Sequence, residues 1–245
     1  MLVDLTMPMS EDMAGHPIHG RTPVFVSGTL KHDRLYPSTN RRNPYDESPL
    51  SFENANVFMC DHTGTHMDAP LHADPGGVAV HEMALEYGHG AAVWLDLSPR
   101  FGDAAEVTAD DLEDAEARSG VRVRAGDILL VWTAWSTVLP DADRYVRRHM
   151  GLTRDAADWV RSKGVRTLGI DCCTPETVSG AASSPVHMNL LKPQSLGGGD
   201  PVVAIIENLV NIDRIPGHRF TFTGVPLPLR GLTGSPIRAF AQVDR

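Results

Sequence analysis

Residues 62–72 concentrate side chains that could bind a metal ion. This segment contains three histidines and one aspartate, namely His62, His66, Asp68 and His72. A glycine between two threonines and a following proline disfavour a helix, so an extended chain is predicted. With a period of two, the last three side chains would point to the same side, and a turn at the glycine would bring His62 beside them. Neutral imidazoles with one carboxylate suit a divalent cation and leave a coordination position open for water.

A polar loop whose histidines bond to the backbone is the alternative for this segment. It would be preferred for a single histidine, but burying three histidines and an aspartate together without a metal is costly. The chain has 11 histidines and only 3 cysteines. Cys60 stands alone and Cys172 and Cys173 are adjacent, so there is no C-x-x-C pair for a structural zinc site. A metal site is therefore predicted to use imidazole and carboxylate ligands.

Three residues further along the chain are candidates for the same site. His187 lies at the predicted start of a helix, and Glu207 follows the apolar run 202–206. A carboxylate in that position lies near the core and needs a cation or strong donors, with a salt bridge to Arg238 as the alternative to a metal. Asp171 also follows an apolar run, and sites in α/β folds lie at the carboxyl ends of strands, so it is predicted to contact the substrate.

The remaining histidines fall into two groups. His16 and His19 lie in a stretch rich in glycine and proline that could close over a site, and they are predicted to line the substrate pocket. The others are predicted to be surface or structural residues, namely His32, His81, His89, His149 and His218.

The elements that would position these residues form an α/β pattern with more strands than helices. Short apolar runs bounded by Gly, Pro or Asp predict strands at 2–5, 23–27, 56–60, 92–97, 128–133, 165–170, 202–206, 219–223 and 237–243. The chain has no internal repeat, low-complexity tract or charge block. Residues 1–245 are therefore assigned to a single domain.

Capping signals predict the helices. Helices are predicted within 108–120 and 153–164, because each stretch has an N-cap threonine, early acids and a terminal glycine. A third helix is predicted to begin at Ser184-Pro185, with proline in the first helical position. Residues 28–51 are polar and rich in Asn, Pro and Arg, so a long functional loop is predicted there.

The composition excludes two classes of protein. The chain has 31 acidic and 22 basic residues and a net charge of −9, which argues against nucleic-acid binding. No run approaches 18 consecutive apolar residues, so no membrane span is expected. The beginning of the chain lacks a signal peptide and the number of cysteines is odd, so a cytoplasmic protein is expected. The predicted partner is a small-molecule substrate.

The histidine segment resembles the motif of the metal-dependent cyclase family, which includes bacterial kynurenine formamidases and isatin hydrolases. The family motif His-x-Gly-Thr-His-x-Asp-x-Pro-x-His is complete at residues 62–72. Further similar landmarks, found between about residue 2 and residue 243, are Asp4-Leu5-Thr6, Gly126-Asp127-Ile128-Leu129-Leu130, Thr133-Ala134-Trp135, Gly169-Ile170-Asp171, His187, Glu207-Asn208-Leu209 and Gly234-Ser235-Pro236-Ile237-Arg238-Ala239. The resemblance implies a single-domain swivelling β/β/α fold, assembled as a homodimer or homotetramer.

The resemblance also implies a set of metal ligands. His62, His66 and Asp68 match the ligands of a first ion. Asp68 would bridge to a second ion, whose other ligands match His187 and Glu207. In members similar to isatin hydrolase a glutamine replaces this glutamate and one Mn²⁺ is bound. Glu207 therefore favours the formamidase-like arrangement with Zn²⁺, in one or two ions, and Mn²⁺ is the alternative.

Two departures from the family pattern concern the substrate and the second ion. Formamidases carry an aromatic residue near the N-terminus that packs on the substrate ring, whereas residues 15–20 here are Gly-His-Pro-Ile-His-Gly. The segment between His187 and Glu207 is longer than in compact formamidases and contains Gly197-Gly198-Gly199. The exact substrate is therefore left open.

These residues together predict a hydrolase of a small amide, arylformamide or cyclic amide. A divalent metal lowers the pKa of its bound water from about 15.7 to about 7, and the metal-bound hydroxide would attack the carbonyl. His72, matched by the resemblance to the general acid/base, would take the proton and return it to the leaving amine. Asp171 would orient the substrate or a ligand histidine. The alternatives are a cyclase or dehydratase that acts on a polyketide-like intermediate with the same metal site, and a non-catalytic metal-binding module.

Overall fold

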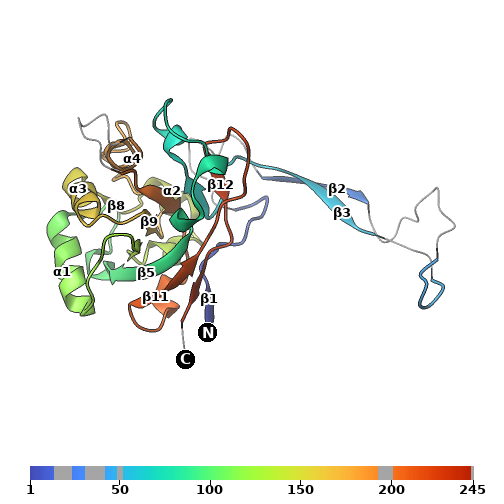
Figure 1. Ribbon diagram of the computed structural model, residues 1–245, viewed down its shortest axis with the longest axis horizontal. Coiled ribbons are helices and arrows are strands. Elements are labelled where there is room, and N and C mark those ends of the chain that lie inside the picture. Colours follow the sequence, from blue (N-terminus) through green and yellow to red (C-terminus); the bar gives the residue numbers. More distant parts are fainter. Residues whose placement is uncertain (14–23, 31–41, 49–51, 193–200, 244–245) are drawn as a thin grey trace.

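A nine-stranded sheet forms the centre of the computed structural model, which describes residues 1–13, 24–30, 42–48, 52–192 and 201–243. In spatial order its strands are β1 (Leu2–Asp4), β13 (Phe240–Gln242), β11 (Arg219–Thr223), β5 (His89–Asp96), β7 (Ile128–Trp132), β9 (Thr167–Ile170), β10 (Ala204–Glu207), β4 (His66–Asp68) and β12 (Gly234–Pro236). The pairs from β5 to β10 are parallel, and the pairs on both sides of this group are antiparallel. The predicted mixed α/β class is confirmed (Figure 1).

The parallel strands are covered on both faces, which explains why their sequences are almost continuously apolar. On one face Val93 and Leu95 belong to a buried cluster that includes side chains of helices α1 (Ala109–Ser119), α3 (Arg154–Ser162) and α4 (Pro185–Leu191). On the other face Ala92 and Trp94 belong to a second buried cluster, which contains Phe220, Phe222 and residues near the chain start. The helices therefore lie together on one side of the sheet (Figure 1).

Local capping determines where the helices begin. Thr108 accepts a hydrogen bond from the backbone N–H of Asp111, whose carboxylate in turn accepts one from the Thr108 N–H, and α1 is followed by Gly120 at φ 67°. Such reciprocal caps satisfy backbone donors that the first helical turn leaves free. All three predicted helices are present as α1, α3 and α4. The sequence reasoning missed α2 (Ala142–Arg147), which is only six residues long.

Each predicted strand overlaps a strand of the structure, and β4 falls in the stretch that was expected to be extended. Among the described residues, the strands missed are β12, β6 (Glu106–Val107) and β8 (Gly151–Leu152). The expected extended chain through the histidine segment was only partly right, because β4 ends at Asp68 and the chain then turns through the short 3-10 helix η1 (Pro70–His72). The other 3-10 turns are η2 (Val80–Glu82), η3 (Leu85–Tyr87), η4 (Ser98–Arg100), η5 (Trp135–Val138) and η7 (Ile212–Arg214).

A two-stranded hairpin extends away from the rest of the protein. It consists of β2 (Phe25–Leu30) and β3 (Asn54–Phe58), which pair with each other in a separate antiparallel sheet. Figure 1 shows this hairpin on the right, far from the helices. Residues 28–30, predicted to begin a long loop, belong to β2, whereas 31–41 and 49–51 of that loop lie outside the described residues.

The two ends of the described chain lie side by side. β1 pairs with β13, and the amino group of Met1 donates a hydrogen bond to the carbonyl of Val243. No helix in the described part of the chain is long and apolar enough to cross a membrane.

Candidate metal centre

Strand β4 carries two of the predicted metal ligands on one side. The turn that precedes it contains Gly64 at φ 66°, a backbone conformation that favours glycine, as expected from the sequence. β4 is held between β10 and β12, so that His66 lies opposite Glu207 and Asp68 lies opposite Gly234. Because alternate residues of a strand face the same side, His66 and Asp68 point together into one site.

The predicted ligands converge on the Asp68 carboxylate. His62 Nδ1 lies 2.7 Å from Asp68 Oδ1, and His66 Nε2 lies 3.2 Å from the same oxygen. His187 Nε2 lies 3.6 Å from Asp68 Oδ2. Glu207 closes the cluster, because its two carboxylate oxygens lie 3.4 Å from His66 Nε2 and 3.4 Å from His187 Nε2. Residues far apart in the sequence are thus brought within contact distance, as the sequence reasoning predicted.

His72 lies at the edge of this cluster, on the turn η1. Its ring centroid is 4.2 Å from that of His62 and 5.6 Å from that of His187. It lines a cavity of about 160 Å³ together with His62, Asp68, His187 and Glu207. Cys173, Thr174, Glu176, Ser184 and Met188 also line this cavity. His72 is therefore placed where a substrate could reach both it and the convergent ligands.

The hydrogen bonding of Asp68 fits a bound cation. Asp68 is 1% exposed, and neither of its carboxylate oxygens has a hydrogen-bond partner of good geometry in the described structure. A buried carboxylate without hydrogen bonds is costly unless a cation compensates it. Two groups of residues each have their possible ligand atoms within 4.8 Å of one another. One group is His62, Asp68 and His72, and the other is His66, Asp68 and Glu207. Both groups contain Asp68, which suits a carboxylate shared by two ions.

Electrostatics in the cluster favour positive charge. Burial opposes the protonation of His66, but the carboxylates of Asp68 and Glu207 outweigh it and raise the pKa of His66 to about 9. The pKa of His187 is raised well above its ordinary value, because contacts with carboxylates likewise outweigh burial. Burial alone would raise the pKa of Asp68, but His62 and His66 hold it well below its ordinary value. Protons on imidazoles thus neutralise the carboxylates here, and a divalent ion would replace them.

His72 differs from the other histidines of the site. Burial is the largest effect on its pKa and lowers it, and the neighbouring His62 and His187 lower it further. A neutral imidazole near neutral pH can accept a proton, which is what a general base requires.

Each of the three histidines that face Asp68 has a hydrogen-bond partner on its other ring nitrogen. His62 Nε2 lies 2.9 Å from the Thr233 hydroxyl, which donates to Asp61. His66 Nδ1 lies 2.8 Å from the carbonyl of Gly64, and His187 Nδ1 lies 2.8 Å from Glu176 Oε1. Such outer partners fix the tautomer and the orientation of a metal ligand.

Sequence reasoning missed these outer partners. Asp61 immediately precedes the motif, but Thr233 is 171 residues away from His62, and no local pattern connects the two. Sequence reasoning also assigned Gly234 no role in shaping the site. A Cβ at this position would lie 2.7 Å from Cε1 of His62. A glycine in this position therefore leaves the space that the imidazole occupies.

Asp171 lies away from the centre. It is completely buried and does not line the cavity. Its carboxylate accepts hydrogen bonds from the backbone N–H and hydroxyl groups of Thr133 and Ser136, at 2.7 to 3.2 Å. Burial raises its pKa even though these hydrogen bonds oppose the shift. The structure thus brings Asp171 to the turn after β7 and not to the substrate cavity.

The remaining site predictions have different outcomes. His16 and His19 lie outside the described residues. The salt bridge considered for Glu207 was wrong, because the Arg238 guanidinium lies 2.6 Å from Asp4 Oδ2 at the surface. Other histidines have structural partners, as predicted. For example, His218 stacks on Trp94, and the buried His149 contacts the Met150 carbonyl.

Buried imidazoles and carboxylates that converge at one cavity of a mixed sheet are typical of a metal-dependent protein. Comparison with known proteins agrees with this class. The family model described as "Putative cyclase" matches residues 3–177. The chain belongs to this family.

Curated relatives extend over most of the chain. A kynurenine formamidase of Geobacillus thermodenitrificans is 28% identical over 186 residues, which cover 75% of this chain and 77% of that protein. An isatin hydrolase of Roseibium aggregatum is 26% identical over 252 residues, which cover 94% of this chain and 88% of that protein.

Solved structures share the fold. Isatin hydrolase A from Ralstonia solanacearum has a TM-score of 0.80 and 25% identity, covering 100% of this chain and 92% of that one. A structure described as a potential metal-dependent hydrolase with cyclase activity has a TM-score of 0.70 and 25% identity, covering 100% of this chain and 99% of that one. These likenesses confirm the predicted cyclase-type fold.

Proposed function

We propose that this protein is a metal-dependent hydrolase of a small amide, arylformamide or cyclic amide. The main supporting observation is the Asp68 carboxylate, which is buried at the base of a cavity and has imidazoles as its nearest polar contacts. The relatives confirm the predicted class of activity, since a kynurenine formamidase and an isatin hydrolase both act on carbon–nitrogen bonds outside peptides. Which amide is hydrolysed is the open part of the proposal.

The metal is proposed to be Zn²⁺, in one or two ions, with Mn²⁺ as the alternative. His62, His66 and Asp68 would hold one ion, and Asp68, His187 and Glu207 would hold a second. The presence of a second carboxylate, 3.4 Å from two of the imidazoles, supports the assignment of two ions. Nitrogen and carboxylate ligands in this mixture suit zinc and manganese better than calcium or copper(I).

When bound, such an ion polarises a carbonyl group and makes a water molecule acidic enough to attack it at neutral pH. His72 supplies the proton transfer in the proposed mechanism. Its pKa is lowered, so its neutral ring can take the proton of the attacking water and then deliver it to the leaving nitrogen. The neighbouring cavity wall, which includes Thr174 and Met188, would position the substrate over His72.

Asp171 is proposed to support this site indirectly. Its four hydrogen bonds fix the turn from Thr133 to Ser136, and the residues that directly follow it include Cys173 and Thr174 of the cavity wall. His16 and His19 remain proposed as substrate contacts, on sequence alone. A cytoplasmic location remains proposed from the sequence, because the number of cysteines is odd.

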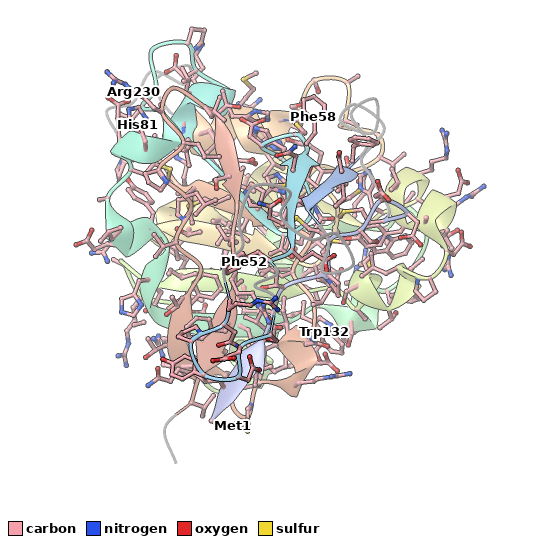
Figure 2. All side chains as sticks on the ribbon, turned by 90° about the vertical axis from the view of Figure 1, so that its right-hand side faces the viewer. Met1, Phe52, Phe58, His81, Trp132 and Arg230 are labelled. Carbon is pink, nitrogen blue, oxygen red and sulfur yellow. The ribbon has the colours of Figure 1, made fainter. Side chains whose placement is uncertain are left out.

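The assembly is proposed to be a homodimer or homotetramer. Phe25, Val26, Val57 and Phe58 of the hairpin are 45% to 65% exposed, and every residue of β3 is exposed. Figure 2 looks along the hairpin toward the sheet, with Phe58 labelled. A two-stranded hairpin with apolar side chains on its surface is marginally stable alone, so a second copy of the chain is its proposed cover.

Light scattering on the wild type and on the double variant Val57→Ser/Phe58→Ser tests this assembly. We expect the variant to shift toward the monomer while its helical circular dichroism is retained. The matched control is Leu85→Ser, which removes an equally exposed apolar side chain outside the hairpin. A monomeric wild type would rule out the proposed assembly.

The function is tested with protein loaded with Zn²⁺ or Mn²⁺ and two substrate types, an arylformamide and isatin. We expect release of formate from the first or a gain of one water in mass by the second. A cyclase is the second candidate, because one similar structure is described as having cyclase activity. A linear polyketide-like substrate that yields an isomeric product, or a product lighter by one water, would favour this candidate. Metal binding without turnover of any of these substrates would favour the non-catalytic module.

A further inference from the structure

Glu176 is a buried acid that sequence reasoning did not use. It is 2% exposed and lies between β9 and α4. Its backbone is firmly placed, because Leu152 of β8 donates a hydrogen bond to the carbonyl of Pro175 at 2.8 Å and forms a parallel bridge with Glu176. Gly151 permits this approach, since a Cβ at that position would clash with the Glu176 carbonyl oxygen.

The carboxylate of Glu176 is directed at the beginning of α4. Its Oε1 accepts hydrogen bonds from the backbone N–H groups of Val186 and His187, at 3.0 and 2.8 Å. The same oxygen lies 2.8 Å from Nδ1 of His187. Within the described residues, His187 is also the one basic side chain within ion-pair distance of Glu176. Backbone and side chain of His187 are therefore held by a single carboxylate oxygen.

This contact decides which nitrogen of His187 faces the metal centre. With its Nδ1–H donated to Glu176, the ring can offer the lone pair of Nε2 to an ion that displaces the proton of Nε2. Nε2 points toward Asp68 and Glu207, at 3.6 and 3.4 Å. The tautomer and the ring orientation are thus those that a metal ligand needs.

The nearest outer partners of the other two histidines are a hydroxyl for His62 and a backbone carbonyl for His66, and His62 Nε2 also lies 3.8 Å from Asp61 Oδ2. Among the three, His187 has a carboxylate at hydrogen-bond distance from its outer nitrogen, at 2.8 Å. A carboxylate is the stronger acceptor and makes the imidazole a better donor to a metal.

We propose that Glu176 is a positioning residue that fixes His187 for binding the ion shared with Glu207, an inference that rests on the metal centre of the proposed function. Glu176 would act only through His187. Its removal should therefore weaken metal binding without adding to the effect of removing His187 itself.

The test measures zinc affinity by competition with a chromophoric chelator, together with metal content after dialysis. The variants are Glu176→Ala, Glu176→Gln, His187→Ala and the double variant Glu176→Ala/His187→Ala. Glu116→Ala is the matched control, because Glu116 is also a buried carboxylate that accepts a backbone N–H, from Val123, but it pairs with Lys163 far from the centre.

We expect Glu176→Ala to weaken the affected zinc site by about 10- to 100-fold. Glu176→Gln should lie between this variant and the wild type, because the amide oxygen still accepts from Nδ1 but carries no charge. The double variant should bind zinc as His187→Ala does, and Glu116→Ala should bind as the wild type does.

Wild-type affinity in Glu176→Ala, or additive losses in the double variant, would overturn the positioning role. If Glu176→Ala does not fold, Glu176→Gln decides, and a zinc affinity equal to that of the wild type would then refute it. A wild-type protein that binds no zinc or manganese would reject the metal centre itself, which separates that failure from a failure of Glu176.

Discussion

Two buried aspartates show what distinguishes a carboxylate of the candidate centre from a structural one. Asp171, which follows β9, accepts four hydrogen bonds from Thr133 and Ser136, whereas Asp68 on β4 faces three imidazoles and has no hydrogen-bond partner of good geometry in the described structure. Burial dominates at Asp171 and raises its pKa, whereas the histidines hold the pKa of Asp68 well below its ordinary value. Burial alone therefore does not identify a candidate metal site. A buried carboxylate that faces several imidazoles in place of backbone and hydroxyl donors does.

The largest effect is expected from Asp68→Ala. This change removes the carboxylate common to both groups of ligands, so metal content should fall to background. Loss of the ion removes several kcal/mol of transition-state stabilisation, which corresponds to about 10³-fold or more in kcat/KM. Elemental analysis and steady-state kinetics measure the two effects. Full metal occupancy in Asp68→Ala would disprove the bridging role.

His72→Ala separates proton transfer from metal binding at the same centre. We expect it to retain the metal but to lose about 10²- to 10⁴-fold in kcat, the usual contribution of a general acid/base. The variant Cys173→Ser, at another wall position, serves as the control for disturbance of the cavity. Near-wild-type turnover in His72→Ala would show that the acid/base is another residue.

Asp171→Ala should affect stability rather than chemistry. It leaves the buried donors of Thr133 and Ser136 without an acceptor, which costs about 3 kcal/mol. For a chain of this length the midpoint of thermal unfolding should fall by roughly 10 °C. Zinc affinity of the folded variant should remain that of the wild type, in contrast to Asp68→Ala. A drop in zinc affinity comparable to that of Asp68→Ala would contradict the distinction between the two aspartates.

The pH dependence of the metal-free protein tests the charge on the imidazoles of the candidate centre. The pKa of His66 is raised from 6.5 to about 9, so its contribution to stability is fully present below about pH 6.5 and is lost as pH rises toward 9. Thermal unfolding of protein treated with a chelator should therefore shift to lower temperature over this window. The zinc-loaded protein should decline less, because the ion takes the place of the proton. Equal pH profiles of the two forms would contradict this interpretation.

Much of the fold follows from local patterns. The strands β5, β7, β9 and β10 were predicted because parallel strands buried on both faces need almost continuous apolar sequences. α1 was predicted from its capping residues. The extended conformation of β4 was expected, but its partners β10 and β12 were not. β12 could not be predicted in this way, because Gly234–Pro236 is not an apolar run and pairs with β4 alone in the described structure.

Residue types and their spacing were enough to propose the chemistry of the candidate centre. They supplied the candidate ligand types, the glycine turn before His66, and the candidates His187 and Glu207 far from the motif. The folded chain was needed to show that His72 lies on a turn beside these candidates, that Arg238 pairs with Asp4, and that the carboxylate of Asp171 accepts its hydrogen bonds elsewhere.

The fold also determines which residues contact the outer ring nitrogens of the candidate ligand histidines. Asp61, Thr233 and Glu176 carry no sequence signal for this role, because their contacts depend on how the folded segments pack against one another. Residue type and spacing report local conformation, whereas hydrogen bonding across 171 residues depends on packing of the whole chain. This difference explains why the candidate ligands could be proposed from the sequence, whereas their outer hydrogen-bond partners could not.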